Sequence, residues 1–368
     1  MDEFTAIAVA TMSRDGITLI EQSGLDEHIA PFIKPHMEGF ENPERIQMTL
    51  QYLKENDALK DMMRFKTPAA TIEEALLVHS PYQVHSVELM SKLGSGQLGE
   101  SAYASENLLS SALYALGGSL LGAELVASEA CRHSFSLVRP PGHHATTSSS
   151  MGLCFFNNIA ISVKKIMKDN GIKKVTILDI DDHYGNGTAE IFYNDPSVQF
   201  ISIHEYNYES FGLGHFGEIG QGKGKGTNIN VPLIEESHDT SYKTAVNKIV
   251  VPAIESFNPD VIAVSAGFDA HFTDPIGDMN VDSRTYWFIA SAVDRLVSSL
   301  EMKGSFWVLE GGYNPLVLGP CVRATLDGLR GKSLPELEDQ EERDVDENIV
   351  KSNNKVINKI LETVSPFF

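Results

Sequence analysis

The chain has 368 residues, of which 42% are hydrophobic, with a formal net charge of −21 and three cysteines. This acidity argues against a general nucleic-acid binder, because such proteins neutralise phosphates with lysine and arginine. Cys131, Cys154 and Cys321 lie far apart without a Cys-x-x-Cys pair, which argues against a disulfide framework or a cysteine zinc site. We find no signal-peptide pattern and no apolar run of transmembrane length, so we expect a soluble cytoplasmic protein without membrane contact, or a nuclear one in a eukaryote.

The first third of the chain is predicted to be mainly helical. The patterns predict a strand over 5–11, helices that begin near 43, 71 and 81, a glycine-rich loop over 94–99, and a long apolar helix over about 105–130. Asn42 is the expected N-cap of the first helix, with Pro43 at its first position. The pair Gly117-Gly118 inside the long helix is costly for helix stability, and it therefore indicates close packing.

Strands and helices alternate through the rest of the chain. Strands are expected over 134–138, 175–180, 198–204, 260–265 and 305–309. One helix is expected to end near 171 and another to begin at 188, and two more are expected over 239–257 and about 283–300. This order predicts an α/β fold with one parallel sheet and helices on both faces. We assign residues 1–331 to one domain and 332–368 to an acidic segment and an amphipathic helix over 349–364, which could serve packing or homo-oligomer contact.

Polar motifs follow the five predicted strands, and ligands of open α/β sheets bind at such strand ends. Asp181 and His183 end the strand over 175–180, and alternate residues of an extended chain point the same way. The pair could therefore bind one metal ion, although a polar turn explains it equally well. Two adjacent histidines, His143 and His144, follow the strand over 134–138 on a loop shaped by proline and glycine. A glycine-rich segment over 220–226 lacks the Gly-Lys-Ser/Thr ending of a phosphate loop, so we interpret it as an ordinary loop.

Five motifs in order resemble those of the zinc-dependent histone deacetylase family, closer to its class II and acetylpolyamine amidohydrolase branches. They are R-P-P-G-H-H-A (139–145), G-L-C-F-F-N-N (152–158), D-I-D-D-H-Y-G-N-G-T (179–188), S-A-G-F-D-A-H-F-T-D-P-I-G (265–277) and E-G-G-Y-N-P (310–315). The resemblance covers roughly residues 20–330. It implies the single-domain arginase/deacetylase fold, with an eight-stranded parallel sheet flanked by helices.

The resemblance also implies the metal sites. Asp181, His183 and Asp269 are the expected zinc ligands, and three protein ligands leave a position open for water and substrate. An inner, structural potassium site is expected at Asp179, Asp181, His183, Ser202 and Ile203. For Ser202, an ordinary strand hydroxyl is nearly as good an explanation.

The catalytic groups follow from the same motifs. His144 is expected to take a proton from the zinc-bound water and pass one to the leaving amine, with Asn186 as its hydrogen-bond partner. His143 is expected to bond Asp179. Tyr313 would stabilise the oxyanion of the tetrahedral intermediate together with the zinc.

Several positions depart from the family pattern in the expected substrate channel of Gly152, Leu153, Phe211, Ile276 and Ser101. Leu153 stands where the family has a phenylalanine, so we expect a wider acyl channel. Ser101 stands where the family has a rim aspartate, and Glu100 is a possible substitute. Ile276 replaces the glutamate of polyamine specialists, which weakens a polyamine interpretation.

The preferred function is a zinc-dependent amidohydrolase that removes acetyl or longer acyl groups from lysine-type amines. The alternatives are a deacetylase of acetylpolyamines or other small amides, a two-metal ureohydrolase, and an inactive module that binds acyl-lysine. The ureohydrolase needs a further carboxylate at 185, where this chain has glycine. Retention of both histidines, all three expected ligands and Tyr313 argues against an inactive module.

Overall fold

The computed structural model describes residues 16–22, 40–60, 62–208 and 212–367. The strand predicted over 5–11 and the channel residue Phe211 lie outside these ranges.

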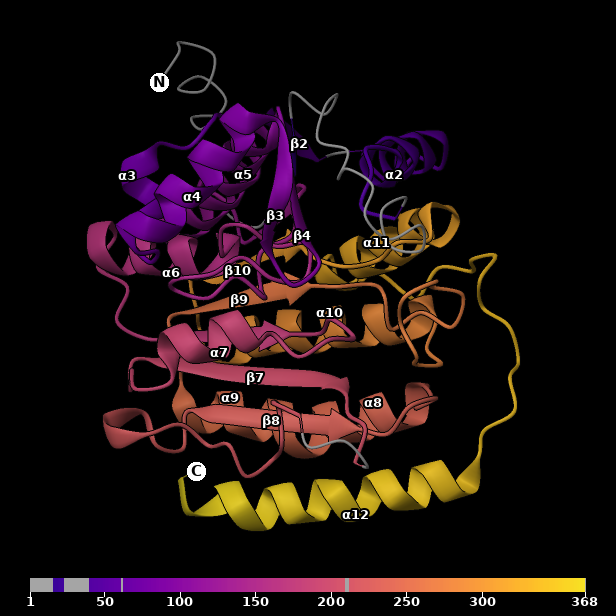
Figure 1. Cartoon of the computed structure of the whole chain (residues 1–368). Coiled ribbons are helices and arrows are strands. Elements are labelled where there is room, and N and C mark those ends of the chain that lie inside the picture. Colours follow the sequence, from indigo (N-terminus) through magenta and orange to yellow (C-terminus); the bar gives the residue numbers. More distant parts are fainter. Residues whose placement is uncertain (1–15, 23–39, 61, 209–211, 368) are drawn as a thin grey trace.

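The centre of the protein is an eight-stranded sheet (Figure 1). Its strands, in spatial order, are β2 (Met63–Lys66), β1 (Ile17–Glu21), β5 (His133–Leu137), β10 (Gly304–Leu309), β9 (Val261–Ala266), β6 (Val175–Asp179), β7 (Val198–Glu205) and β8 (Asn228–Leu233). Every neighbouring pair is parallel. All carboxyl ends therefore meet at one edge, and the predicted eight-stranded parallel sheet is confirmed.

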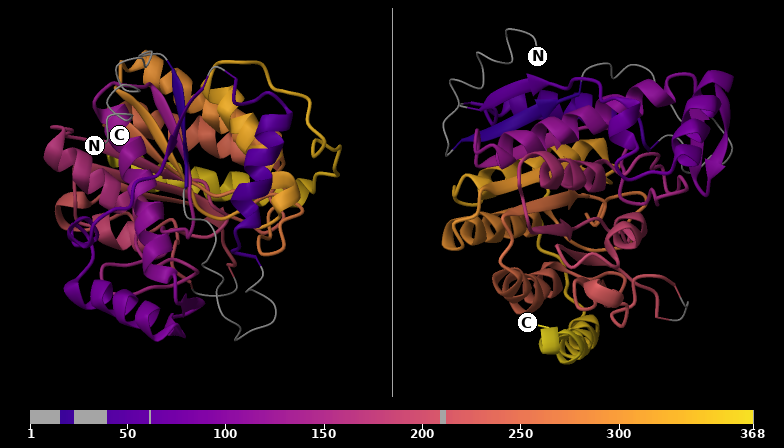
Figure 2. Two further views of the ribbon diagram at one scale, coloured as in Figure 1. Left: turned by 90° about the horizontal axis from the view of Figure 1, so that it is seen from above. Right: turned by 90° about the vertical axis from the view of Figure 1, so that its left-hand side faces the viewer.

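Helices cover both faces of the sheet, as Figure 2 shows from two further sides. One face packs against α5 (Leu108–Ala127), α6 (Asn158–Asp169) and α7 (Asn186–Phe192). The other packs against α2 (Glu44–Glu55), α8 (Asp239–Ala245), α9 (Val251–Phe257), α10 (Ser283–Ser299) and α11 (Pro315–Leu329). Successive residues of a strand alternate between the two cores: Ile177 joins the α5–α6 side and Leu178 the α10–α11 side, both fully buried. This double burial explains the continuous apolar runs of the central strands.

Smaller elements complete the fold. They are α3 (Ile72–Ala75), α4 (Pro81–Leu93), the antiparallel hairpin of β3 (Ser95–Gly99) and β4 (Ala102–Ser105), the π-helical turn Val246–Val250 between α8 and α9, and short 3-10 turns at Gly222–Gly224 and Ser365–Phe367. The helix expected near 71 begins with a capping box, in which the Thr71 hydroxyl accepts from the Glu74 amide and the Glu74 carboxylate accepts from the Thr71 amide. Asn42 was predicted as the N-cap of α2 with Pro43 at the first helical position, but the helix begins at Glu44 and its N-cap is Pro43. Asn42 Oδ1 still accepts from the Glu44 amide at 2.9 Å.

The prediction of a loop over 94–99 was wrong, because this segment forms β3. Strands β1, β2, β4 and β8 were also missed, and for two of them, β2 and β8, the reason is clear. The four-residue strand β2 lies at one edge of the sheet with alternating burial, and β8 contains Pro232 and two asparagines. Both therefore lack the continuous apolar run that marks the central strands.

The glycine pair of α5 lies where predicted, at a close contact. A Cβ on Gly117 would come within 1.9 Å of the Pro68 carbonyl oxygen, and one on Gly118 within 2.7 Å of Val138 Cγ1. Helix α5 is long and apolar enough to cross a membrane by length and composition alone, contrary to our expectation, but 67% of that segment is buried inside the protein. Its apolarity therefore fits a core helix.

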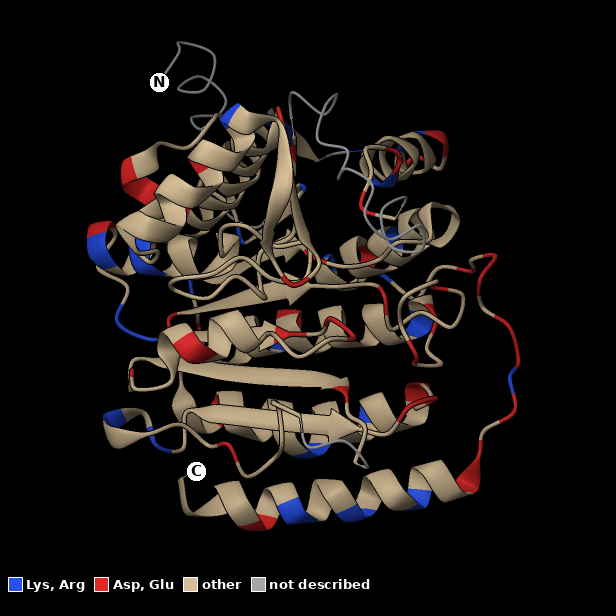
Figure 3. Ribbon diagram, in the orientation of Figure 1, with Lys and Arg blue, Asp and Glu red and all other residues tan. Residues whose placement is uncertain are grey.

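The C-terminal helix α12 (Glu347–Val364) lies beside β8, after a connecting segment rich in acidic residues (Figures 1 and 3). Ile357, Ile360 and Val364 are fully buried and join the same core as residues of β8 and α8. Asn353 accepts from the Ile234 amide at 3.0 Å and donates to Ser241 at 3.0 Å. The helix therefore stabilises the β8 side of the fold, and the boundary at 331 stays a prediction.

We predict that Ile357→Ala lowers the free energy of unfolding by about 3 kcal/mol, because it removes a fully buried side chain from the core. Chemical denaturation measures the change. Lys355→Ala, at an exposed position of the same helix, is the matched control and should stay close to the wild type. Equal stability of the two variants would show that α12 does not contribute to the core.

Candidate active site

Four neighbouring strands, β5, β10, β9 and β6, deliver the predicted motifs to one edge of the sheet. The tandem histidines follow β5, and Glu310 to Tyr313 follow β10. Asp269 follows β9, and Asp181 and His183 follow β6. Residues far apart in sequence are thus brought together by the parallel order of the strands.

Asp181, His183 and Asp269 form a group whose potential ligand atoms all lie within 4.8 Å of one another. His183 Nδ1 lies 3.0 Å from Asp269 Oδ2 and 3.3 Å from Asp181 Oδ1. Both carboxylates are 1% exposed, and their other oxygens accept backbone N–H groups: Gly311 to Asp181 Oδ2 at 2.8 Å, and Asp182 to Asp269 Oδ1 at 2.9 Å. The backbone thus orients both side chains toward the histidine.

The electrostatics of this group favour a cation. Burial and the charge of Asp181 raise the pKa of Asp269. Burial opposes protonation of His183, but hydrogen bonds to Asp181 and Asp269 raise its pKa well above the usual value. Among the described residues, neither carboxylate forms an ion pair with a lysine or arginine. Two buried carboxylates and an imidazole that converge in this way suit a divalent metal ion with a position left open.

The tandem histidines occupy different environments. His143 Nδ1 lies 3.1 Å from Asp179 Oδ2, and His144 Nδ1 lies 2.7 Å from Asn186 Oδ1, the two pairings that were predicted. Burial opposes protonation of His143, but the Asp181 and Asp179 carboxylates outweigh it and raise its pKa to about 10. Burial and the charge of His143 lower the pKa of His144 to about 3.

The amide of Asn186 determines which nitrogen of His144 carries the proton. Asn186 Nδ2 donates to the Met151 sulfur at 3.5 Å, and a thioether can only accept. Asn186 Oδ1 therefore faces His144 and accepts from its Nδ1–H. This tautomer leaves His144 Nε2 free to accept a proton.

Tyr313 is 7% exposed and borders the same cavity. Its amide donates to Asp274 Oδ2 at 2.6 Å, and the Arg45 guanidinium lies 4.6 Å from the centre of its ring. Burial raises the pKa of the Tyr313 hydroxyl well above its usual value, so the group stays protonated and can donate. Asp274 and Arg45 were not singled out from the sequence. Asp274 bonds the backbone of Tyr313 and Arg45 lies over its ring, and both are distant from Tyr313 in sequence.

The cavity has a volume of about 290 Å³. Four polar side chains line one part of the cavity: His144, His183, Asn186 and Tyr313. The rest of the lining consists of Met151, Gly152, Leu153, Ile276, Glu100 and Ser101. The predicted channel residues within the described ranges therefore all line one cavity. Leu153 presents an aliphatic side chain there, 8% exposed.

The hairpin β3–β4, which was missed, supports this lining. The carbonyl oxygens of Glu100 and Ser101 accept from the amides of Gly152 and Leu153 at 2.8 and 2.9 Å. Gly152 has φ +52°, and a Cβ there would lie 2.4 Å from His144 Cδ2. Glycine is therefore required for the His144 ring to occupy its position.

The residues of the expected potassium site lie together at the ends of β6 and β7. Asp179 pairs with Ser202 in the register of the two strands, and Ile203 follows in β7. The Ser202 hydroxyl bonds His204 Nδ1 at 2.9 Å. The hydroxyl therefore has a partner within its own strand.

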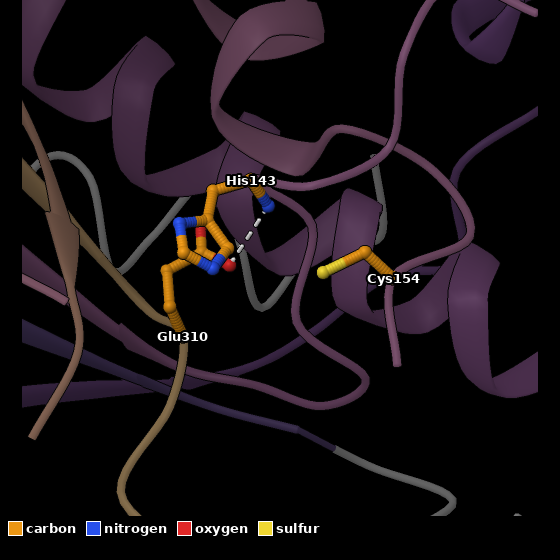
Figure 4. A group of neighbouring side chains, drawn as sticks. All are labelled: His143, Cys154 and Glu310. Carbon is orange, nitrogen blue, oxygen red and sulfur yellow. Dashed lines mark hydrogen bonds between the residues drawn. The ribbon is translucent and has the colours of Figure 1, made fainter. Parts of the chain in front are cut away.

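Two further groups of metal-ligand residue types are hydrogen-bonded scaffolds. Figure 4 shows His143, Cys154 and Glu310, where the Glu310 carboxylate accepts from the His143 amide at 3.1 Å. The Cys154 thiol donates to the Gly152 carbonyl at 3.3 Å. In the second group, His271 with Cys321 and Asp339, both ring nitrogens of His271 have partners, Thr273 at 3.0 Å and Asp339 at 3.2 Å.

Comparisons with known proteins agree with this geometry. The family model of the histone deacetylase domain matches residues 39–329, and the chain belongs to this family. A probable deacetylase of Archaeoglobus fulgidus is 37% identical over 279 residues, which cover 74% of this chain and 76% of that protein. A probable deacetylase of Methanothermobacter thermautotrophicus is 38% identical over 301 residues, which cover 81% and 87%. The crystal structure of the HDA15 HD domain has a TM-score of 0.84 and 27% identity, and covers 96% of both chains.

His79 supports the loops of the site from behind. It is 2% exposed, its Nδ1 donates to the Thr146 carbonyl at 2.9 Å, and its Nε2 accepts from the Asn157 amide at 2.8 Å. Asn157 Nδ2 in turn donates to the Ala145 carbonyl at 3.1 Å. Burial lowers the pKa of His79 from 6.5 to about 4, so the histidine is neutral in this network.

We therefore predict that His79 makes the free energy of unfolding depend on pH. Its folded pKa lies below the unfolded value, so its stabilisation is complete above pH 6.5 and is lost as the pH falls to about 4. The loss is about 3 kcal/mol for a shift of this size. His79→Gln should be less stable than the wild type at pH 7, with a difference that shrinks toward pH 4.

Denaturation at several pH values measures this difference. His85→Gln is the matched control, because the His85 side chain is 71% exposed, and it should follow the wild type at every pH. A stability difference for His79→Gln that stays constant from pH 7 to pH 4 would contradict the assignment.

Proposed function

We propose that the protein is a zinc-dependent amidohydrolase that removes acetyl or longer acyl groups from lysine-type amines. The observation that carries the proposal is the convergence of Asp181, His183 and Asp269. Of these, His183 lines the same cavity as His144 and Tyr313. Membership of the deacetylase family supports amide hydrolysis as the reaction class. Zinc suits the three ligands, and when bound it polarises the amide carbonyl and makes water more acidic.

The residues of the chain supply the proton transfers. His144 Nε2 is free to take a proton from the attacking water and to return it to the leaving amine, because Nδ1–H is held by Asn186. His143, held by Asp179, provides a positively charged neighbour. The protonated hydroxyl of Tyr313 would donate to the oxyanion as it forms.

A structural potassium ion at Asp179, Asp181, His183, Ser202 and Ile203 belongs to the same proposal. It rests on the resemblance and on the juxtaposition of the ends of β6 and β7. A buried cation there would offset the charge of Asp179 and Asp181, both almost fully buried.

The proposed substrate is an acylated lysine or a small acylated amine. Acetylpolyamines are the second candidate, because the net charge of −21 suits cationic substrates. Against them, Ile276 lines the cavity at the position where polyamine specialists have a glutamate, and it supplies no carboxylate to bind an amine. A panel of acyl-lysine peptides and acetylpolyamines, assayed with and without a metal chelator, tests the proposal. Hydrolysis that a chelator leaves unchanged, or none with any substrate, would overturn it.

We predict that Tyr313→Phe lowers turnover about 10²–10³-fold, the usual effect of losing one oxyanion donor. Zinc content, measured by elemental analysis, should remain that of the wild type, because Tyr313 is not a proposed ligand. Asp269→Ala is the contrasting variant and should lose the metal together with the activity. Full turnover in Tyr313→Phe, or full zinc in Asp269→Ala, would remove the proposed role of that residue.

We also predict that Leu153 widens the acyl channel. Leu153→Phe should shift relative kcat/KM from butyryl- and longer acyl-lysine toward acetyl-lysine, by roughly 10-fold, the discrimination that one or two methylenes provide. Ile276→Val, at another apolar position of the lining, is a control for general disturbance and should shift this ratio less. An unchanged ratio in Leu153→Phe would show that Leu153 does not shape specificity.

A further inference from the structure

Glu310 is a completely buried carboxyl group at the carboxyl end of β10, and the proposed chemistry does not use it. Its Oε2 accepts from two successive amides, Gly142 at 2.6 Å and His143 at 3.1 Å. Its Oε1 accepts from the Ser265 hydroxyl at 3.1 Å. Among the described residues no lysine or arginine pairs with this carboxyl group, and Glu310 does not line the cavity. Its partners are therefore the backbone of the histidine loop and one hydroxyl of β9.

The backbone that begins at Glu310 is held separately from its side chain. The Glu310 amide donates to the Ala266 carbonyl at 3.0 Å, and the Glu310 carbonyl accepts from Arg45 at 2.6 Å. Arg45 also donates to the Gly312 carbonyl at 2.7 Å and lies over the ring of Tyr313. The contacts that hold segment 310–313 to β9 and α2 are therefore independent of the Glu310 side chain.

The side chain joins this fixed segment to the histidine loop, as Figure 4 shows for His143. Gly142 is itself closely packed, because a Cβ there would lie 2.6 Å from the Phe156 carbonyl oxygen. The two buried amides would have no acceptor without Glu310 Oε2 among the contacts of the described residues. Glu310 Oε2 is thus the direct link between the loop that carries His143 and His144 and the segment that carries Tyr313, while other contacts hold the opposite side of the loop.

We propose that Glu310 is a positioning residue that holds the His143–His144 loop in register with the Tyr313 segment, so that proton transfer and oxyanion stabilisation act on the same amide. The inference rests on the proposed hydrolase function. It requires an acceptor at the position of Oε2, and it does not require a negative charge. Burial raises the pKa of Glu310 to about 7, and either protonation state can accept the two amide hydrogens through Oε2.

The test compares three variants of Glu310 with the wild type, each assayed at the same zinc content per chain as the wild type. Glu310→Ala removes the acceptor, whereas Glu310→Gln keeps an oxygen for the two amides and offers its NH₂ group to Ser265. Glu310→Asp keeps the charge but is one methylene too short, and it carries the test if the alanine variant does not fold. Ser265→Ala, which removes only the third hydrogen bond, is the matched control.

With an acetyl-lysine peptide, Glu310→Ala and Glu310→Asp should lower kcat by about 10–100-fold with KM changed less than about 3-fold, as expected when reacting groups are displaced. Glu310→Gln and Ser265→Ala should keep kcat within about 5-fold of the wild type. Wild-type kcat in Glu310→Ala would overturn the inference. An equal loss in Glu310→Gln would show that charge matters, and would overturn it as well.

Hydrogen exchange of the backbone amides separates this inference from the proposed function. Peptides covering 139–145 should exchange faster in Glu310→Ala than in the wild type and in Glu310→Gln, whereas peptides covering 310–314 should not change. If the wild type hydrolyses no acyl substrate, the proposed function fails and the exchange pattern alone decides the positioning role. Unchanged exchange at 139–145 in Glu310→Ala would overturn it.

Discussion

Two buried carboxylates that share one imidazole are the interaction on which the site depends. Asp181 and Asp269 are each 1% exposed, and both face His183 Nδ1. Such carboxylates are costly to bury unless a cation and hydrogen bonds compensate them. The backbone provides hydrogen bonds and also approaches both side chains closely: a Cβ on Gly267 would lie 2.2 Å from Asp181 Oδ2, and one on Gly311 2.2 Å from Asp269 Oδ2. The proposed zinc would be the cation that compensates the two buried charges.

The parallel sheet makes this concentration of polar groups possible. Because β5, β10, β9 and β6 are neighbours, their loops meet although they are separated by up to about 170 residues in sequence. Further buried groups then fix the loops to one another: His79 behind the histidine loop, Asp274 and Arg45 at Tyr313, and Glu310 between the two. The proposed catalytic groups are thus held by a surrounding layer of hydrogen bonds, which is the usual requirement for a precisely arranged site.

The sequence predicted the parts of the structure that have a local signal. Continuous apolar runs identified β5, β6, β7, β9 and β10, and the resemblance of the motifs that follow four of them to a known family predicted the proposed ligands, both histidines and Tyr313. The edge strands β2 and β8 carry no such run, and β3 resembled a loop because of its glycines. Glu310 stood within a recognised motif but was not singled out, because its partners Gly142, His143 and Ser265 are visible only once the chain has folded.

The most direct test of the account is a zinc titration of metal-free protein. The protein is stripped with a chelator, zinc is added back in known amounts, and the release of acetate from an acetyl-lysine peptide is measured. We predict that activity is absent without metal, rises linearly with zinc and saturates at one zinc per chain. Activity that persists in the metal-free protein, or saturation at two metal ions per chain, would contradict the account.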